Sequence, residues 1–138
     1  MTTHQSNPII FIVGPTAVGK TSLAIDLAEE LGAEIVSCDA MQVYKEINIA
    51  SAKPSVKDLK RVPHHAINLV SVTESFNVAQ FRTVACLAIE DIHNRRKPVF
   101  VVGGSGMYMS VLLDGLFEGA PLDQKFRQEI EQEIETKG

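Results

Sequence analysis

The segment from Gly14 to Thr21 reads GPTAVGKT and directly follows the apolar run IIFIV. The pattern Gly14-x4-Gly19-Lys20-Thr21, between an expected strand and an expected helix, is typical of a P-loop. Its glycines let the backbone wrap an anion, the helix N-terminus directs amides at it, and the lysine adds charge. We therefore predict phosphate binding by Gly14, Pro15, Thr16, Ala17, Val18, Gly19, Lys20 and Thr21, with the Thr21 hydroxyl on a Mg²⁺ ion.

Acidic residues near this loop decide between hydrolysis and other phosphate chemistry. A P-loop NTPase normally holds its magnesium with a second aspartate at the end of another buried strand. The expected strand VFVV ends in Gly103-Gly104-Ser105-Gly106, without an acid, whereas EIVSC leads directly into Asp39. Asp39 could be a magnesium ligand, a general base or the N-cap of a short helix, and a cap can coexist with a catalytic role.

The elements that position these residues alternate along the chain. Apolar runs predict strands at 9–13, 34–38, 66–70 and 99–102, with a polar loop at 53–61. Helices are expected at 21–31, with a stripe of Leu23, Leu27 and Leu31, at 75–97, capped by Ser75 or Asn77, and at 109–113. In the long helix, one face carries Val78, Phe81, Ala85, Ala88 and Ile92. Strands joined through helices predict an α/β fold with a P-loop NTPase-like parallel sheet and helices on both faces.

Composition sets the outer limits. At 138 residues the chain has room for one domain, and its 45% hydrophobic content is ordinary for a globular protein. No apolar run approaches a membrane span and MTTHQSNP is no signal peptide, so we expect a cytoplasmic protein without a membrane partner. Cys38 and Cys86 lack metal-ligand spacing and are expected to be reduced thiols. The net charge of −4 argues against nucleic-acid binding over the whole surface, which leaves basic clusters at 53–61 and 95–97.

Four motifs stand together in this sequence: GPTAVGKT, DAMQVY from Asp39, ASAKP followed by HH, and PVFVVGGSGMY. In this order and spacing, from Ile9 to Leu116, the chain resembles the tRNA dimethylallyltransferases, also called tRNA isopentenyltransferases. The resemblance implies that the P-loop holds the diphosphate of dimethylallyl diphosphate as a leaving group. It further implies that the prenyl unit goes to N6 of an adenosine next to the anticodon, flipped out of the tRNA.

The same resemblance implies roles for individual residues. Asp39 matches the family's general base, and Ser105 matches a hydroxyl, usually threonine, beside the allylic oxygen of the diphosphate. The tRNA anticodon stem-loop would be contacted at Asp39, Ala40, Met41 and Gln42. Val18, Ala40 and Ser105 depart from the residues common in the family but remove no required functional group. His64 and His65 match a histidine pair expected to position a loop, and Tyr108 is expected to pack in a helix.

Length is the larger departure, because family members continue for roughly as many residues again. The resemblance implies a prenyl-diphosphate-binding core at 1–117, incomplete at its C-terminal end, and the truncated start of an inserted helical tRNA-binding domain at 118–138. We expect this chain alone to bind tRNA weakly, to self-associate and to transfer no appreciable prenyl group. The alternatives are a small-molecule or nucleotide kinase, a prenyltransferase acting on free adenylates, and an inert truncated diphosphate-binding domain.

Overall fold

Four parallel strands form the central sheet of the protein. The structure is a computed structural model, and it describes residues 8–14, 19–47 and 53–116. The sheet has the order β1-β4-β2-β3, with every neighbouring pair parallel. The strands are β1 (Ile9–Val13), β2 (Glu34–Ser37), β3 (His64–His65) and β4 (Val99–Gly103). Because β4 lies between β1 and β2, the ends of β1, β2 and β4 meet at one edge.

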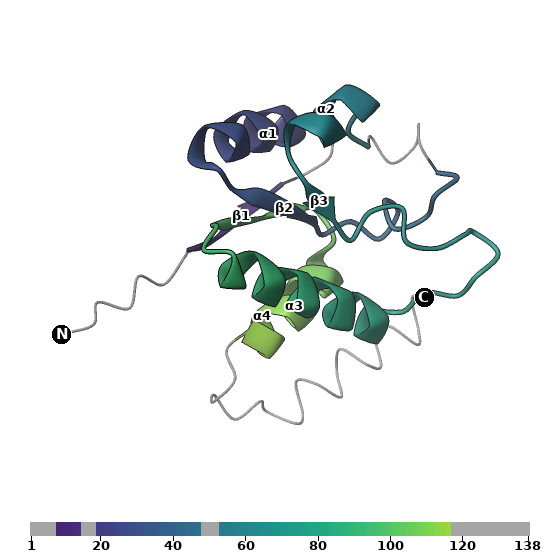
Figure 1. Ribbon diagram of the computed structural model, residues 1–138. Helices are drawn as coiled ribbons and strands as arrows, with labels where there is room; N and C mark the ends of the chain where they lie inside the picture. Colours follow the sequence, from purple (N-terminus) through teal and green to yellow (C-terminus); the bar gives the residue numbers. More distant parts are fainter. Residues whose placement is uncertain (1–7, 15–18, 48–52, 117–138) are drawn as a thin grey trace.

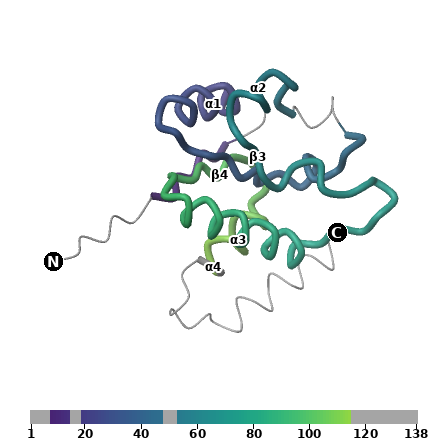
Figure 2. The backbone as a smooth tube through the Cα atoms, viewed as in Figure 1, coloured from purple at the N-terminus to yellow at the C-terminus, as the bar shows by residue number. Residues whose placement is uncertain are grey.

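Helices cover both faces of this sheet, which confirms the expected fold class. One face carries α1 (Lys20–Leu31) and α2 (Val56–Arg61), and the other carries α3 (Val78–Asn94) and α4 (Gly106–Leu116) (Figure 1). The backbone tube shows the same three layers (Figure 2). In the part of the chain that the structure describes, no helix is long and apolar enough to cross a membrane.

Helix α1 begins and ends as its sequence predicts, but it buries a different face. Gly32, at φ 69°, terminates it in the left-handed conformation that glycine adopts most easily. The buried side consists of Ala24, Ile25 and Ala28, small enough to bring the helix close to the sheet. The leucine stripe lies beside this side and stays exposed: Leu23 by 54%, Leu27 by 36% and Leu31 by 55%. A stripe of leucines at helical spacing thus marks a helix here without marking its core face.

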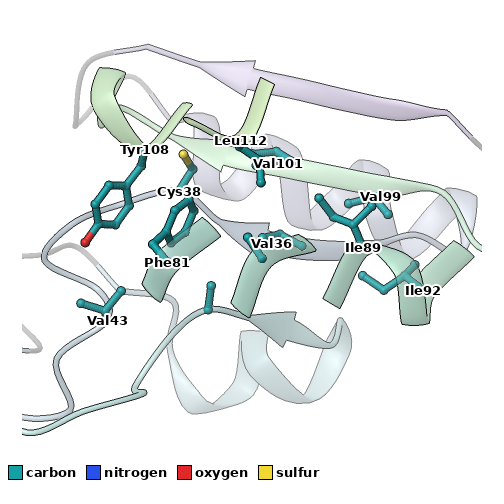
Figure 3. Packing of buried hydrophobic residues seen from close by; sticks show 12 residues of the cluster. Val36, Cys38, Val43, Phe81, Ile89, Ile92, Val99, Val101, Tyr108 and Leu112 are labelled. Atoms are coloured by element: carbon teal, nitrogen blue, oxygen red, sulfur yellow. The ribbon is translucent and has the colours of Figure 1, made fainter. Parts of the chain in front are cut away.

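Helix α3 supplies most of the opposite core. Asn77 caps it in a full capping box, its side chain accepting from the Gln80 amide at 2.8 Å while the Gln80 side chain accepts from the Asn77 amide. Of the predicted face, Phe81, Ala85 and Ile92 are buried, whereas Val78 and Ala88 are partly buried. The rings of Phe81 and Tyr108 stack with centroids 4.1 Å apart (Figure 3). The expected packing role of Tyr108 is therefore confirmed.

Two local predictions are wrong. Residues 66–70 form no strand, because Ala66 and Asn68 adopt positive φ angles of 61° and 53° and turn the chain away from the sheet. The predicted loop at 53–61 contains α2, which Ser55 caps by accepting from the Asp58 amide at 3.1 Å. The spacing Ser55-x-x-Asp58 is a helix-start signal that the charge-based interpretation passed over.

The predictions for the C-terminal part of the chain have a mixed outcome. The short helix expected at 109–113 is longer, because α4 begins at Gly106 immediately after the glycine-rich turn. The predicted segment at 118–138, with its stripe of Leu122, Phe126, Ile130 and Ile134, lies outside the described residues, as do Pro15, Thr16, Ala17 and Val18. Cys38 is buried and Cys86 is partly buried, and both are free thiols as expected.

Candidate functional site

The predicted site residues from three motifs meet at the carboxyl ends of the strands. A cavity of about 190 Å³ opens there between the first turn of α1 and the end of β2. Its described lining includes Lys20, Thr21, Asp39, Gln42 and Gly103. Ligands of open parallel sheets bind at this edge, where the loops after the strands converge. The candidate site therefore lies where a parallel α/β fold places one.

The N-terminus of α1 presents the described part of the predicted phosphate loop. Gly19, at φ 77°, precedes the helix and provides no side chain to cap its first amides. Gly14, after β1, and Gly19, Lys20 and Thr21 are described, and the last three line the cavity. An uncapped helix N-terminus with an adjacent lysine suits an anion. The arrangement agrees with phosphate binding at this end of the cavity.

Gly103, the last residue of β4, and Gly104 after it allow the backbone to approach neighbouring segments closely. A Cβ atom on Gly103 would lie 2.1 Å from the Cys38 carbonyl oxygen, and one on Gly104 would lie 2.9 Å from the Gly14 oxygen. The same Gly104 position is 4.0 Å from Lys20 Nζ. Any side chain at 103 would displace the backbone that leads into Asp39. These two positions thus join the phosphate loop, the end of β2 and the end of β4 into one site.

Asp39 begins a tight turn after β2. Its Oδ1 atom accepts the backbone amides of Met41, at 2.8 Å, and Gln42, at 3.4 Å. The predicted capping role is therefore present, although it caps a turn and not a helix. These two bonds orient the carboxylate through Oδ1. Among the described residues, no hydrogen bond to Oδ2 is found. Asp39 can thus hold the turn with one oxygen and offer the other to a ligand in the cavity.

Ser105 is tied to the same turn from the β4 side. Its Oγ atom accepts the Ala40 amide at 2.9 Å, and its own amide donates to the Cys38 carbonyl at 3.3 Å. Because the hydroxyl accepts in the first bond, its proton remains for a further acceptor. Ser105 is therefore bonded to the residues on either side of Asp39, the other predicted catalytic residue, a link that sequence spacing could not show.

A second, more apolar cavity of about 340 Å³ lies on the α4 side of this turn. Val13, Gly14, Ser105, Met109 and Ser110 are among its lining residues, and Gly103 lines both cavities. The glycine-rich turn therefore separates two cavities, of which the one beside Lys20 and Asp39 is the more polar. The Cys38 thiol nearby is inert, because burial, with a smaller effect of the Asp39 carboxylate, raises its pKa to about 12.

Residues 66–70, which form no strand, are hydrogen-bonded to the turn that begins at Asp39. The amides of Asn68 and Leu69 donate to the carbonyls of Gln42 and Val43, at 2.9 and 2.7 Å. Lys53 Nζ donates to the Tyr44 carbonyl and, at 2.6 Å, to Asn68 Oδ1. This lysine, the basic residue of ASAKP, thus holds two loops together.

Sequence reasoning missed two polar residues of the cavity that Lys20 and Asp39 line. Ser37, only 2% exposed, donates its hydroxyl to Gln42 Oε1 at 2.7 Å and orients that side chain. His64 lines the same cavity, although the sequence suggested only loop positioning. Ser37 stands two residues before Asp39 on a strand, so side-chain alternation could have placed it on the Asp39 side.

Both predicted basic clusters contain residues that form ion pairs with acidic side chains. Arg95 binds Glu34 with both terminal nitrogens, and Lys97 Nζ lies 3.4 Å from the same carboxylate. Arg61 pairs with Asp26, at 2.9 Å, and Glu29, at 2.5 Å. The Glu34 side chain is 2% exposed and lies at the start of β2, away from the site. Its cationic partners therefore serve the fold, and less positive surface remains for nucleic acid than the sequence suggests.

Known proteins with similar sequences carry one activity in their names. A tRNA dimethylallyltransferase 2 of Geotalea uraniireducens is 48% identical over 130 residues, which cover 94% of this chain and 42% of that protein. A tRNA dimethylallyltransferase of Thermotoga petrophila is 42% identical over 129 residues, with the same coverage. The chain thus spans less than half the length of these curated relatives.

Solved structures agree with the fold. The full-length tRNA isopentenylpyrophosphate transferase of Bacillus halodurans superposes with a TM-score of 0.75 and 38% identity, covering 94% of this chain and 43% of that one. A eukaryotic dimethylallyltransferase acting on tRNA superposes with a TM-score of 0.71 and 39% sequence identity. The match covers 76% of this chain and 26% of that one. The model of the IPP transferase family matches residues 42–138, more than half of the chain. With the glycine-rich turn, the Asp39 turn and the α1 N-terminus in one site, the chain belongs to the IPP transferase family.

Proposed function

We propose that this chain binds dimethylallyl diphosphate and carries the reactive half of a tRNA dimethylallyltransferase, acting in the cytoplasm. The acceptor would be N6 of the adenosine next to the anticodon, presented by the tRNA anticodon stem-loop. One observation carries the proposal: Lys20, Thr21 and Asp39 line the same cavity. An anion-binding helix end and an oriented carboxylate are the two groups that such a transfer requires.

The transfer breaks the bond between C1 of the prenyl group and the diphosphate oxygen, and it forms a bond between C1 and N6. One N6 proton leaves as the new bond forms, because the N6 lone pair is delocalised into the adenine ring. Asp39 would take this proton at Oδ2, since Oδ1 is held by the turn amides. The two electrons of the broken bond leave with the diphosphate.

The leaving group gains negative charge, and several groups of this chain would stabilise it. Lys20 and the first amides of α1 would bind the terminal phosphate. Ser105 would donate its remaining proton to the allylic oxygen while it keeps the Ala40 amide. The apolar cavity on the other side of Ser105 offers space for the five-carbon chain and would exclude water from C1.

The donor set of the site fits a magnesium ion. The hydroxyl of Thr21 lines the same cavity as the Asp39 carboxylate, and hydroxyl and carboxylate oxygens are hard ligands of the type that Mg²⁺ binds. Thr21 and the diphosphate oxygens would hold the ion, which would supply further positive charge to the leaving group.

Calorimetry with dimethylallyl diphosphate and with ATP tests this proposal on the chain itself. We expect dimethylallyl diphosphate to bind at least as tightly as ATP. The substitution Lys20→Ala should weaken its binding about 10- to 100-fold, because a charge-assisted contact contributes roughly 1.5–3 kcal/mol. Lys57→Ala, at an exposed position of α2, is the matched control. A strong preference for ATP would contradict the proposal and favour the kinase alternative.

A further inference from the structure

His64 occupies a distinctive place in the cavity of about 190 Å³ that Lys20 and Asp39 also line. In the β2–β3 pair, His64 is the partner of Ile35 and His65 is the partner of Val36. Ile35 packs with the α1 side of the sheet and Val36 with the α3 side. The two adjacent histidines therefore face opposite layers: His64 lines the cavity, while His65 Nε2 lies 2.8 Å from Glu34 Oε1.

One hydrogen bond fixes the tautomer of the His64 ring. Its Nδ1 atom lies 2.7 Å from the carbonyl oxygen of Val62. A carbonyl oxygen can only accept, so Nδ1 carries the proton, and in the neutral ring Nε2 is an acceptor. Burial lowers the pKa of His64, against smaller opposing effects of the Val62 carbonyl and Asp58, and the smallest effect, that of His65, lowers it further. The ring is therefore neutral at physiological pH.

Three of the residues that line this cavity carry acceptor atoms. They are Asp39, His64 and Gln42, whose amide oxygen accepts from Ser37, and Asp39 has the sole negative charge among these three. Lys20 and the first turn of α1 line the same cavity and suit a phosphate, whereas these three acceptor groups suit a neutral group with two N–H donors. An exocyclic amine of a nucleobase is a group of this kind.

We propose that Nε2 of His64 accepts a hydrogen bond from the exocyclic amine of an adenine base bound in this cavity. The inference rests on the proposed function, in which Asp39 removes one of the two N6 protons. His64 would hold the proton that stays on N6, before and after transfer. This contact fixes the plane of the amine relative to C1 of the prenyl group, and it favours adenine over bases with a carbonyl oxygen at that position.

Imidazole ¹⁵N NMR of this 138-residue chain tests the contact directly. In the free chain we expect the Nδ1–H tautomer at His64. Saturating adenosine 5′-monophosphate should shift the Nε2 resonance, whereas its N6,N6-dimethyl analogue, which has no N–H on N6, should not. His65 is the internal control and should respond to neither. An Nε2–H tautomer, equal shifts with both nucleotides, or no shift with either would overturn the proposal.

Two substitutions separate this role from a structural one. In His64→Asn the side-chain amide can still donate to Val62 but no acceptor reaches the position of Nε2, while His64→Gln restores an acceptor there. We expect about 3- to 10-fold weaker nucleotide binding for His64→Asn, the value of one hydrogen bond, and partial recovery for His64→Gln, with unchanged melting temperatures. Equal losses in both variants, together with lower melting temperatures, would indicate a structural role. Neither the NMR shift nor nucleotide binding requires prenyl transfer. A failure of dimethylallyl diphosphate binding would therefore contradict the proposed function without deciding the role of His64.

Discussion

At the scale of single residues, the site depends on the Asp39 carboxylate and the Ser105 hydroxyl. Each accepts a backbone amide of the turn and keeps a further atom for a ligand. Asp39 holds its turn through Oδ1, and Ser105 holds the Ala40 amide. The types of these residues could be predicted from the sequence, because the motifs that contain them are specific. Their mutual connection could not, since it depends on 65 intervening residues folding so that β2 and β4 end side by side.

Replacing Asp39 with asparagine tests the general base. Asparagine keeps an oxygen that can accept the Met41 amide, but it cannot take a proton. We expect the single-turnover rate to fall about 10²–10⁴-fold with little change in substrate affinity. The measurement uses a chimera in which this chain replaces the matching part of the Geotalea uraniireducens relative. Ser105→Ala should be milder, and a folded Asp39→Asn variant with near-normal turnover would make Asp39 structural.

Glu34 gives the protein a predictable response to acid. The hydrogen bond from Arg95, followed in size by those from His65 and Lys97, lowers its pKa from 4.5 to about 2 against the opposing effect of burial. A depressed carboxyl pKa stabilises the fold at pH values above 4.5, and this contribution, about 3 kcal/mol, is lost as the pH falls toward 2. Thermal melts between pH 6 and 2 should show this loss, and Glu34→Gln should flatten the pH dependence. The same dependence of melting temperature on pH in the unsubstituted protein and in Glu34→Gln would contradict this prediction.

At the scale of elements, strands β1 and β4 and helix α3 were predictable because their signals are local. The run IIFIV predicts β1 with the bounds that the structure has, and the capping residue Asn77 precedes a long amphipathic segment. The failures have a tertiary origin. Residues 66–70 have a strand-like composition, but Ala66 and Asn68 are left-handed, and the amides of residues 68–70 donate to the carbonyls of Gln42 and Val43. The exposed leucine side of α1 reflects the need for small residues against the sheet.

The capping box of α3 should contribute measurably to stability. Asn77→Ala removes the acceptor of the Gln80 amide, which costs about 1 kcal/mol. We therefore expect a melting temperature lower by roughly 3–6 °C, measured by circular dichroism. Asn77→Ser retains a capping oxygen and should recover most of the loss. An unchanged melting temperature in Asn77→Ala would show that packing of Phe81 and its neighbours alone holds the helix.

At the scale of the whole molecule, we predict self-association through the β1 edge of the sheet and the exposed leucines of α1. Strand β1 has β4 as its single partner among the described residues, and Ile10 and Val13 on it are 38% and 61% exposed. Asp26 and Glu29 of α1 pair with Arg61 of α2. The leucine side of α1 therefore faces away from α2, toward the β1 end of the sheet. Together, the open edge and the leucines form an apolar surface that favours contact with another chain.

Sedimentation velocity over a range of concentrations measures this association. We expect oligomers at micromolar concentrations, and Ile10→Lys should shift the chain toward monomer, because a lysine on an edge strand opposes pairing. Leu87→Lys, at a residue of α3 that is 62% exposed on the other layer, is the control and should change nothing. A monodisperse monomer at all concentrations would contradict the prediction.

The distribution of charge predicts weak tRNA binding by this chain. Arg61, Arg95 and Lys97 are held in ion pairs, while Lys57 and Lys60 of α2 are exposed. Binding through phosphate contacts falls as the salt concentration rises, with a logarithmic slope proportional to the number of contacts. Fluorescence anisotropy from 50 to 200 mM salt should show this fall, and each removed contact, in Lys57→Ala or Lys60→Ala, should reduce the logarithmic slope by about one. Tight binding that is insensitive to salt would overturn this expectation.

The sheet order has a consequence for how the protein is made. Strand β1 is synthesised first, yet its described partner β4 begins about 90 residues later, at Val99. At a translation rate of roughly 5–20 residues per second, the run IIFIV waits roughly 5–20 s before it can pair. During that time a β-branched apolar segment is exposed on the nascent chain, a form that chaperones bind and that aggregates readily. Ribosome-bound chains that stop before Val99 should therefore be the most chaperone-dependent stage of its biosynthesis.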